Sequence, residues 1–333
     1  MKKTSIKDIA KLSGVSVATV SRVINNNGRF SEETRKKILD VIEETGYQMN
    51  FSAKSLRMNK SFSVGILVPD ISNYFFSDVV QKIEEELFEL GYSTIICNTG
   101  RNIEKETAYL NMLRSKLVDG IIVISGVDEF VFHYDDIPYI CIDREPLKKE
   151  KTIFISSNHY QGAFEATESL INNGCKHPAI LMYDRQSSSA KERFKGYKDA
   201  LKKNNISYNE SSHLLLSSGL EENFTENLQA FLERTDQVDS FFAVNDTLAM
   251  KLFSSLKELG EKIPEDFKII GFDDSPLAHY SSPTLSSVKQ NTDKIAQLTV
   301  KNLIDFISSG KIINYQTILV PVELVVRNSS LNN

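Results

Sequence analysis

The sequence predicts an N-terminal all-α helix-turn-helix domain joined to an α/β core of two doubly wound parallel-sheet lobes. Three observations support this fold class. Apolar residues recur at helical spacing through the first 46 residues. From residue 62, runs rich in valine and isoleucine alternate with amphipathic stretches, which is typical of parallel strands covered on both faces. The length of 333 residues also favours two or three units over one compact core.

Two short helices joined by a tight turn are expected within Ser5–Asn25, because Gly14 interrupts a helical pattern that resumes after it. Ser16 is placed to cap the second helix. The outward face of that helix is small, hydroxylated and ends in an arginine; it consists of Val17, Ala18, Thr19, Ser21 and Arg22. Such a helix fits a DNA major groove roughly 12 Å wide, where arginine can bind guanine O6 and N7. The alternative is an ordinary helical hairpin with a solvated polar face.

Charge is distributed unevenly along the chain. Residues 1–60 carry 12 Lys and Arg against 6 Asp and Glu, whereas the remainder carries 27 against 38. A basic domain on an acidic body is typical of a protein that binds the phosphate backbone of DNA. Contact with membrane lipid is the alternative, but no acylation or prenylation signal accompanies the basic residues.

A third helix is expected from Ser31, its cap, to Gly46, with an apolar stripe of Ile38, Leu39 and Ile42 packing on the first two helices. The segment 50–60, NFSAKSLRMNK, is shorter than the roughly 12 to 15 residues that an isolated helix needs for stability. Taken alone, it reads as a flexible linker more readily than as a helix.

IKDIAKLSGVSVATVSRVIN followed by FSEETRKKILDVIEETGY closely resembles the headpiece of the LacI/GalR family of bacterial transcriptional regulators. The resemblance implies a hinge helix over 50–60 that orders on operator DNA, with Leu56 wedged into the minor groove. Met49 and Lys54 depart from the proline and arginine frequent in the family. The expected DNA-contacting residues are Ser5, Ser16, Val17, Ala18, Thr19, Ser21, Arg22, Asn25, Ser31, Lys54 and Leu56.

The core should divide into two lobes between which the chain crosses more than once. The expected domains are 1–49, the headpiece; 50–60, the hinge; and 61–333, the core, with lobe 1 at about 61–158 and 289–318 and lobe 2 at about 159–288 and 319–333. Buried strands are expected at 63–70, 92–100, 120–126, 139–144, 152–157, 178–184, 213–218, 241–246, 268–274 and, as one final strand, 316–326.

Ligands of open α/β sheets bind beyond the carboxyl ends of the strands, where this sequence places polar pairs. Forked carboxylates and guanidinium groups bind vicinal sugar hydroxyls, and aromatic rings cover the apolar face of a sugar. Taken singly, each such residue is more often a helix cap or a turn former than a ligand-binding residue. The resemblance implies that Arg193 and Asp273 grip the ligand, with Asn73, Asp143 and Asn245 at other pocket positions. The full expected set is Asn73, Phe75, Phe76, Asp143, Arg144, Arg193, Asn245, Phe272, Asp273 and Gln290.

The expected function is a sugar-responsive repressor of carbohydrate genes, cytoplasmic and dimeric, reading a pseudo-palindromic operator. A dimer is expected because little chain follows VELVVRN. The alternatives are a catabolite-control regulator with a protein corepressor, a sugar receptor of the periplasmic type, and an α/β enzyme. No phosphate-binding, nucleophile-elbow or zinc-protease motif occurs, and the five histidines are isolated in the sequence.

Cys97, Cys141 and Cys175 are expected to be reduced and buried, since they are odd in number and far apart. No cysteine pair has metal-ligand spacing, so no metal or cofactor is expected. No signal core or membrane-spanning run is present, which predicts no membrane partner.

Overall fold

The computed structural model describes residues 4–24, 26–47, 60–126, 132, 136–184, 187–216, 223–235, 237–309 and 314–331. The chain divides into two compact units, residues 1–61 and 62–333. Asn25, Met49, Lys54 and Leu56, and with them most of the expected hinge, lie outside the described residues.

The first unit contains the three expected helices, α1 (Ile6–Ser13), α2 (Val17–Ile24) and α3 (Glu32–Thr45). Gly14 ends α1 with a φ of 65°, and Gly46 ends α3 with a φ of 60°, a left-handed conformation that glycine adopts without steric cost. A small core holds the helices together and consists of Ile9, Ala10, Val20, Val23 and Ile38. One detail of the expected stripe is wrong: Leu39 is 46% exposed, because only one face of α3 meets the other helices.

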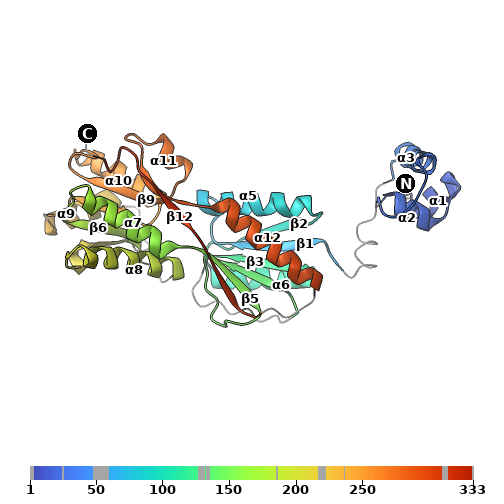
Figure 1. Ribbon diagram of the computed structural model, residues 1–333, viewed down its shortest axis with the longest axis horizontal. Coiled ribbons are helices and arrows are strands. Elements are labelled where there is room, and N and C mark those ends of the chain that lie inside the picture. The colour runs from blue at the N-terminus through green and yellow to red at the C-terminus, as the bar shows by residue number, and fades with distance from the viewer. Residues whose placement is uncertain are drawn as a thin grey trace. The chain divides into compact units, whose positions relative to one another are not determined.

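The first lobe of the second unit has a six-stranded parallel sheet in the order β11-β5-β4-β3-β1-β2. Helices α5 and α12 lie side by side over one face of this sheet (Figure 1), and α6 packs on the other side. The elements are β1 (Ser63–Val68), α5 (Tyr74–Glu89), β2 (Ser93–Asn98), α6 (Ile103–Ser115), β3 (Gly120–Ile124), β4 (Tyr139–Ile142), β5 (Thr152–Ser157), α12 (Thr292–Ser309) and β11 (Gln316–Val320).

The second lobe repeats this scheme with the strand order β12-β10-β9-β8-β6-β7, parallel except where β12 pairs antiparallel with β10. Helices α7 and α8 pack closely against each other in this lobe (Figure 1). Its elements are α7 (His159–Asn172), β6 (Pro178–Tyr183), α8 (Ser188–Lys203), β7 (His213–Leu216), α9 (Phe224–Arg234), β8 (Ser240–Ala243), α10 (Asp246–Glu258), β9 (Lys268–Asp273), α11 (Pro276–Tyr280), β10 (Ser286–Gln290) and β12 (Val322–Val325), with a 3₁₀ turn at Glu210–Ser212.

Three segments join the lobes, at Asn158, Asn291 and Pro321, each between the last residue of one sheet or helix and the first of the next. The single final strand expected at 316–326 is wrong. It is two strands in different sheets, separated at Pro321, which has no N–H to continue a ladder. The strand β10 and the short helix α11 were not expected, and the second and third crossings each lie about two residues after their expected positions.

All three cysteines are buried and unpaired as disulfides, as expected. Burial raises the pKa of the Cys97 thiol to about 11 and that of Cys141 to about 12, so both stay protonated and unreactive. Within the described part of the chain, no helix is long and apolar enough to cross a membrane.

Candidate functional site

The outward face of α2 presents the residues expected to meet DNA. Val17, Ala18 and Arg22 are exposed, and Thr19 and Ser21 are half-buried. The stem of Arg22 lies against Gly28, whose φ of 94° is a conformation that favours glycine. Among the described residues of this face, Arg22 has the largest side chain.

Three serines expected to contact DNA serve as helix caps. The Oγ atoms of Ser5, Ser16 and Ser31 accept hydrogen bonds from the backbone N–H three residues on, at 3.4, 3.1 and 3.2 Å. At Ser5 the cap is reciprocal, because its own N–H donates to Asp8 Oδ2 at 2.8 Å. Caps of this kind stabilise the helices that a DNA backbone would meet; contact with phosphate stays a prediction.

A cavity of about 330 Å³ lies where the strand ends of the two lobes face each other. Its first-lobe wall includes the start of α5 and the residue after β4, and its second-lobe wall includes α8, the segment after β8 and the end of β9. Seven of the expected residues line it: Asn73, Phe75, Phe76, Asp143, Arg193, Asn245 and Asp273. Arg101, Tyr183, Ser187, Ser189, Thr247 and Lys251 also line it without having been expected there as ligand-binding residues.

Asn73 and Asn245 occupy equivalent positions in the two walls. Each is a helix N-cap: the Asn73 oxygen accepts from Phe75 N at 3.1 Å, and the Asn245 oxygen accepts from Leu248 N at 2.8 Å. Because the cap uses the side-chain oxygen, the amide is the group that can donate to a ligand. Each asparagine can therefore cap its helix and donate to a ligand at the same time.

Arg193 is buried in the centre of the site and is held from several sides. Its guanidinium lies over the Phe272 ring, 3.7 Å from the centroid, and donates to the carbonyl oxygen of Val244. Its Nη2 is 3.9 Å from Asp273 Oδ1 and 3.2 Å from Nδ1 of His159. A fork fixed in this way is ready to bind a pair of hydroxyl groups without losing further side-chain freedom.

Asp143 lies at the end of β4 and is 4% exposed. Its Oδ1 accepts from Ser156 Oγ at 2.8 Å, from Ser157 N at 3.2 Å and from His159 Nε2 at 2.9 Å. Burial alone would raise the pKa of Asp143, but the interactions with His159 and Ser156 and the charge of Arg193 stabilise the carboxylate and lower that pKa. The site therefore contains one firmly ionised carboxylate.

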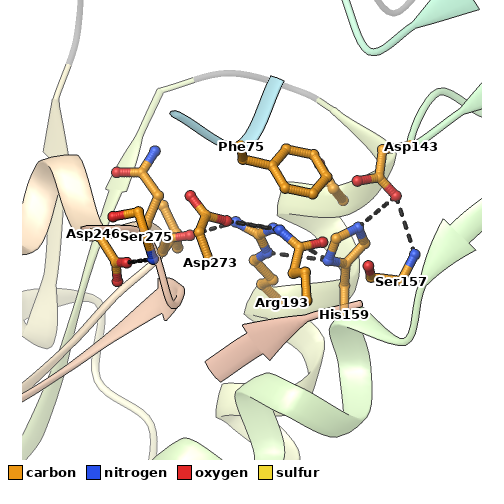
Figure 2. A network of polar contacts seen from close by, with 12 residues as sticks. Phe75, Asp143, Ser157, His159, Arg193, Asp246, Asp273 and Ser275 are labelled. Carbon is orange, nitrogen blue, oxygen red and sulfur yellow. Dashed lines mark hydrogen bonds and ion pairs between the residues drawn. The ribbon is translucent and has the colours of Figure 1, made fainter. Parts of the chain in front are cut away.

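Asp273 is the second carboxyl group, and its environment acts in the opposite direction. Burial raises the pKa of Asp273, the nearby Asp246 adds to that effect, and the charge of Arg193 opposes it. Gln290 Nε2 donates to Asp273 Oδ1 at 2.7 Å. Figure 2 shows Asp143, His159, Arg193 and Asp273 in a row, with the Phe75 ring facing them. The four groups form one polar chain, of which Asp143, Arg193 and Asp273 line the cavity and His159 lies behind its surface.

Three expected residues do not line this cavity. Arg144 is directed elsewhere and forms a buried ion pair with Glu106 at 2.9 Å. Phe272 is fully buried and supports Arg193 from below, and Gln290 supports Asp273 while lining an adjoining cavity of about 790 Å³. These two act on the ligand-binding groups rather than on the cavity surface.

Sequence reasoning also missed His159, which is isolated in the sequence but not in the fold. Its partners Asp143 and Arg193 are 16 and 34 positions away, so no local pattern marks the cluster. The one available signal was its position just after a predicted strand. The described residues hold no group of three or more His, Cys, Asp or Glu that could bind a metal ion.

Comparisons with known proteins match both units. Residues 5–50 match the family model described as bacterial regulatory proteins, lacI family, and residues 167–330 match a periplasmic binding protein-like domain. The ribose operon repressor of Halalkalibacterium halodurans is 32% identical over 98% of this chain and 97% of its own. The HTH-type transcriptional repressor PurR of Vibrio vulnificus is 34% identical over 98% of each chain. The solved complex of the transcriptional regulator CelR with cellobiose is 25% identical, covers 98% of this chain and 100% of that one, and has a TM-score of 0.71.

Proposed function

Because the chain belongs to the LacI family of bacterial regulatory proteins, we propose that it is a transcriptional repressor whose DNA binding is controlled by a small sugar. It acts in the cytoplasm as a homodimer and has no catalytic activity. The observation that carries the proposal is the convergence of Asp143, Arg193 and Asp273 from two lobes on one cavity. Such a cavity changes shape when its occupant draws the lobes together, as a switch requires.

DNA recognition is assigned to α2. An eight-residue helix reaches few base pairs, so specific affinity needs a second headpiece on a half-site about one helical turn away. This is the reason for proposing a dimer on a pseudo-palindrome. Arg22 reads a base in the major groove, and the lysines exposed on α3 contact phosphates.

Effector recognition is assigned to the cavity of about 330 Å³, a volume at the small end of ligand sites. Its hydrogen-bonding groups are forks and amides, and its apolar cover is the pair Phe75 and Phe76, whose ring centroids are 5.5 Å apart. A polyhydroxylated ring fits this combination. One relative is named a ribose operon repressor, and one similar structure holds cellobiose, which agrees with a sugar as the effector class.

The test has two parts. Purified protein is incubated with duplexes from a random library, and the selected sequences are expected to contain a pseudo-palindrome; protein lacking residues 1–60 is expected to select nothing. Pentoses, hexoses, disaccharides and sugar phosphates are then screened by thermal shift. A ligand at a hundred times its Kd stabilises by about 2.7 kcal/mol.

The outcomes separate the rival functions. Sugar binding without DNA selection would indicate a receptor and overturn the repressor. DNA selection without any sugar response, but with a response to a protein partner, would favour the catabolite-control alternative. Conversion of any screened sugar to a new compound would indicate an enzyme.

A further inference from the structure

His159 opens helix α7, one residue after the chain crosses from the first lobe to the second. It is 2% exposed, and its ring packs against Phe272 with centroids 5.6 Å apart. The ring lies between the two charged groups of the cavity, one from each lobe. Nε2 is 2.9 Å from Asp143 Oδ1, and Nδ1 is 3.3 Å from Nε and 3.2 Å from Nη2 of Arg193.

The chemistry of the two partners fixes the state of the imidazole. A guanidinium can only donate, so Nδ1 must present its lone pair to Arg193. An ionised carboxylate can only accept, so Nε2 must carry the hydrogen that goes to Asp143. Burial and the charge of Arg193 lower the pKa of His159 against the opposing effect of Asp143, so the neutral form is the stable one. One tautomer satisfies both partners at once.

The charges around the ring agree with this assignment. Arg193 and Glu192 face it from α8, Asp143 faces it from the end of β4, and Phe272 of β9 contributes an uncharged ring. Arg144, Glu145 and Lys191 line a second cavity together with His159.

We propose that His159 is a positioning residue of the effector site, which holds the Arg193 fork in its ligand-binding orientation and ties it to Asp143 of the other lobe. The inference rests on the proposed function. The guanidinium of Arg193 stacks on the Phe272 ring, and its Nη1 donates to the carbonyl oxygen of Val244. Its Nε edge is held by His159. Without that acceptor the guanidinium can rotate over the Phe272 ring. Its orientation must then be fixed when the ligand binds, and the entropy lost in that step lowers the affinity for the ligand.

Three substitutions separate the two hydrogen bonds of the ring. His159→Phe keeps an aromatic ring against Phe272 and loses both bonds. His159→Asn places an oxygen near the position of Nδ1, so it restores the acceptor for Arg193. His159→Gln places its amide near the position of Nε2, so it restores the donor to Asp143 but not the acceptor. A residue that is merely part of the core would rank these variants by volume instead.

His213→Phe is the matched control. His213 is a partly buried histidine of the second lobe whose ring stacks on Phe194 at 4.9 Å, and it does not line the effector cavity. The same change of side chain therefore perturbs packing in the same lobe without touching Arg193.

The experiment measures the affinity of each variant for the sugar found in the screen, by calorimetric titration of the full-length protein. His159→Phe and His159→Gln are expected to bind the sugar about ten- to a hundredfold more weakly, the usual effect of losing a hydrogen bond to a charged group. His159→Asn is expected to stay within about fivefold of the wild type, a small part of that effect. The His213→Phe control should bind the sugar as tightly as the wild type.

A ligand-independent measurement accompanies the titrations. Two-bond ¹H–¹⁵N correlation spectra of the histidine rings, assigned by the signal missing in His159→Asn, should show His159 with hydrogen on Nε2 only. Hydrogen on Nδ1 would overturn the inference even if His159→Phe fails to fold. So would a folded His159→Phe that binds the sugar as tightly as the wild type, or Asn and Gln variants that are weakened equally. A wild-type protein that binds none of the sugars overturns the proposed function instead.

Discussion

Substituting Asp273 by asparagine tests whether burial or the charge of Arg193 determines the ionisation of the Asp273 carboxyl group. Its side chain is 9% exposed, and Arg193 lies 3.9 Å away. Burial, the largest effect, raises the pKa of Asp273 to about 8 despite the opposing charge of Arg193. Asparagine is the appropriate replacement because the backbone φ of 117° disfavours larger or branched residues, and because an amide resembles the protonated acid.

The expected magnitude follows from proton linkage. When the folded pKa lies above the unfolded value of roughly 3.9, the folded protein keeps a proton that the unfolded chain has released. The stabilisation is complete below the unfolded pKa and is lost as the pH rises through the folded pKa. Between pH 5 and 7, Asp273 should therefore lower the unfolding free energy by up to about 1.4 kcal/mol per pH unit, a contribution that Asp273→Asn lacks.

The assay is urea unfolding followed by circular dichroism at pH 5, 6 and 7, without effector. The wild type should lose about 2.8 kcal/mol more than Asp273→Asn across these two pH units, one proton's worth of linkage. Asp305→Asn, which changes an exposed carboxyl group of α12, controls for the altered net charge. Parallel pH slopes for wild type and Asp273→Asn would show that Arg193 keeps Asp273 ionised, and would refute the reasoning.

Two further predictions concern the headpiece and the helix packing. Arg22→Ala should weaken binding to the selected operator by about 1 to 3 kcal/mol while leaving binding to random duplex nearly intact, as fluorescence anisotropy can measure; equal losses on both would make Arg22 a phosphate contact. Gly196→Ala should destabilise the second lobe by about 1 to 3 kcal/mol in urea, because a Cβ there would overlap the carbonyl oxygen of Tyr160 on α7 and a backbone atom cannot swing aside; an unchanged midpoint would mean that α7 and α8 separate freely.

The headpiece and most of the strands could be predicted because their signals are local. Capping serines, Gly14 and helical spacing act within a few residues of one another, and the structure has each helix where these signals lie. The final strand shows the limit of this reasoning. Its residues are mostly apolar from 316 to 326, and the change of sheet at Pro321 depends on where two already formed sheets end.

The effector cavity was predictable in outline and not in detail for a related reason. Strand ends identify which residues reach the cleft, but not the direction of each side chain once the chain leaves the strand. Asp143 has a φ of 50°, and this turn separates the carboxylate, which faces the cavity, from Arg144, which pairs with Glu106. His159 escaped notice because its contacts exist only after both lobes have folded.

The cavity's charges are already compensated before any ligand enters, and this bears on what the ligand can be. Asp143 accepts three hydrogen bonds, and Arg193 is shared among His159, Val244 and Asp273. A charged ligand would disturb that balance and have to displace one of these partners. An uncharged ligand that both donates and accepts can instead form additional hydrogen bonds with the Asp143 carboxylate and the Arg193 guanidinium. The existing hydrogen bonds of these two groups can then be kept. Because the network joins the two lobes next to a crossing of the chain, we expect a ligand that adds hydrogen bonds to it to hold the lobes closer together.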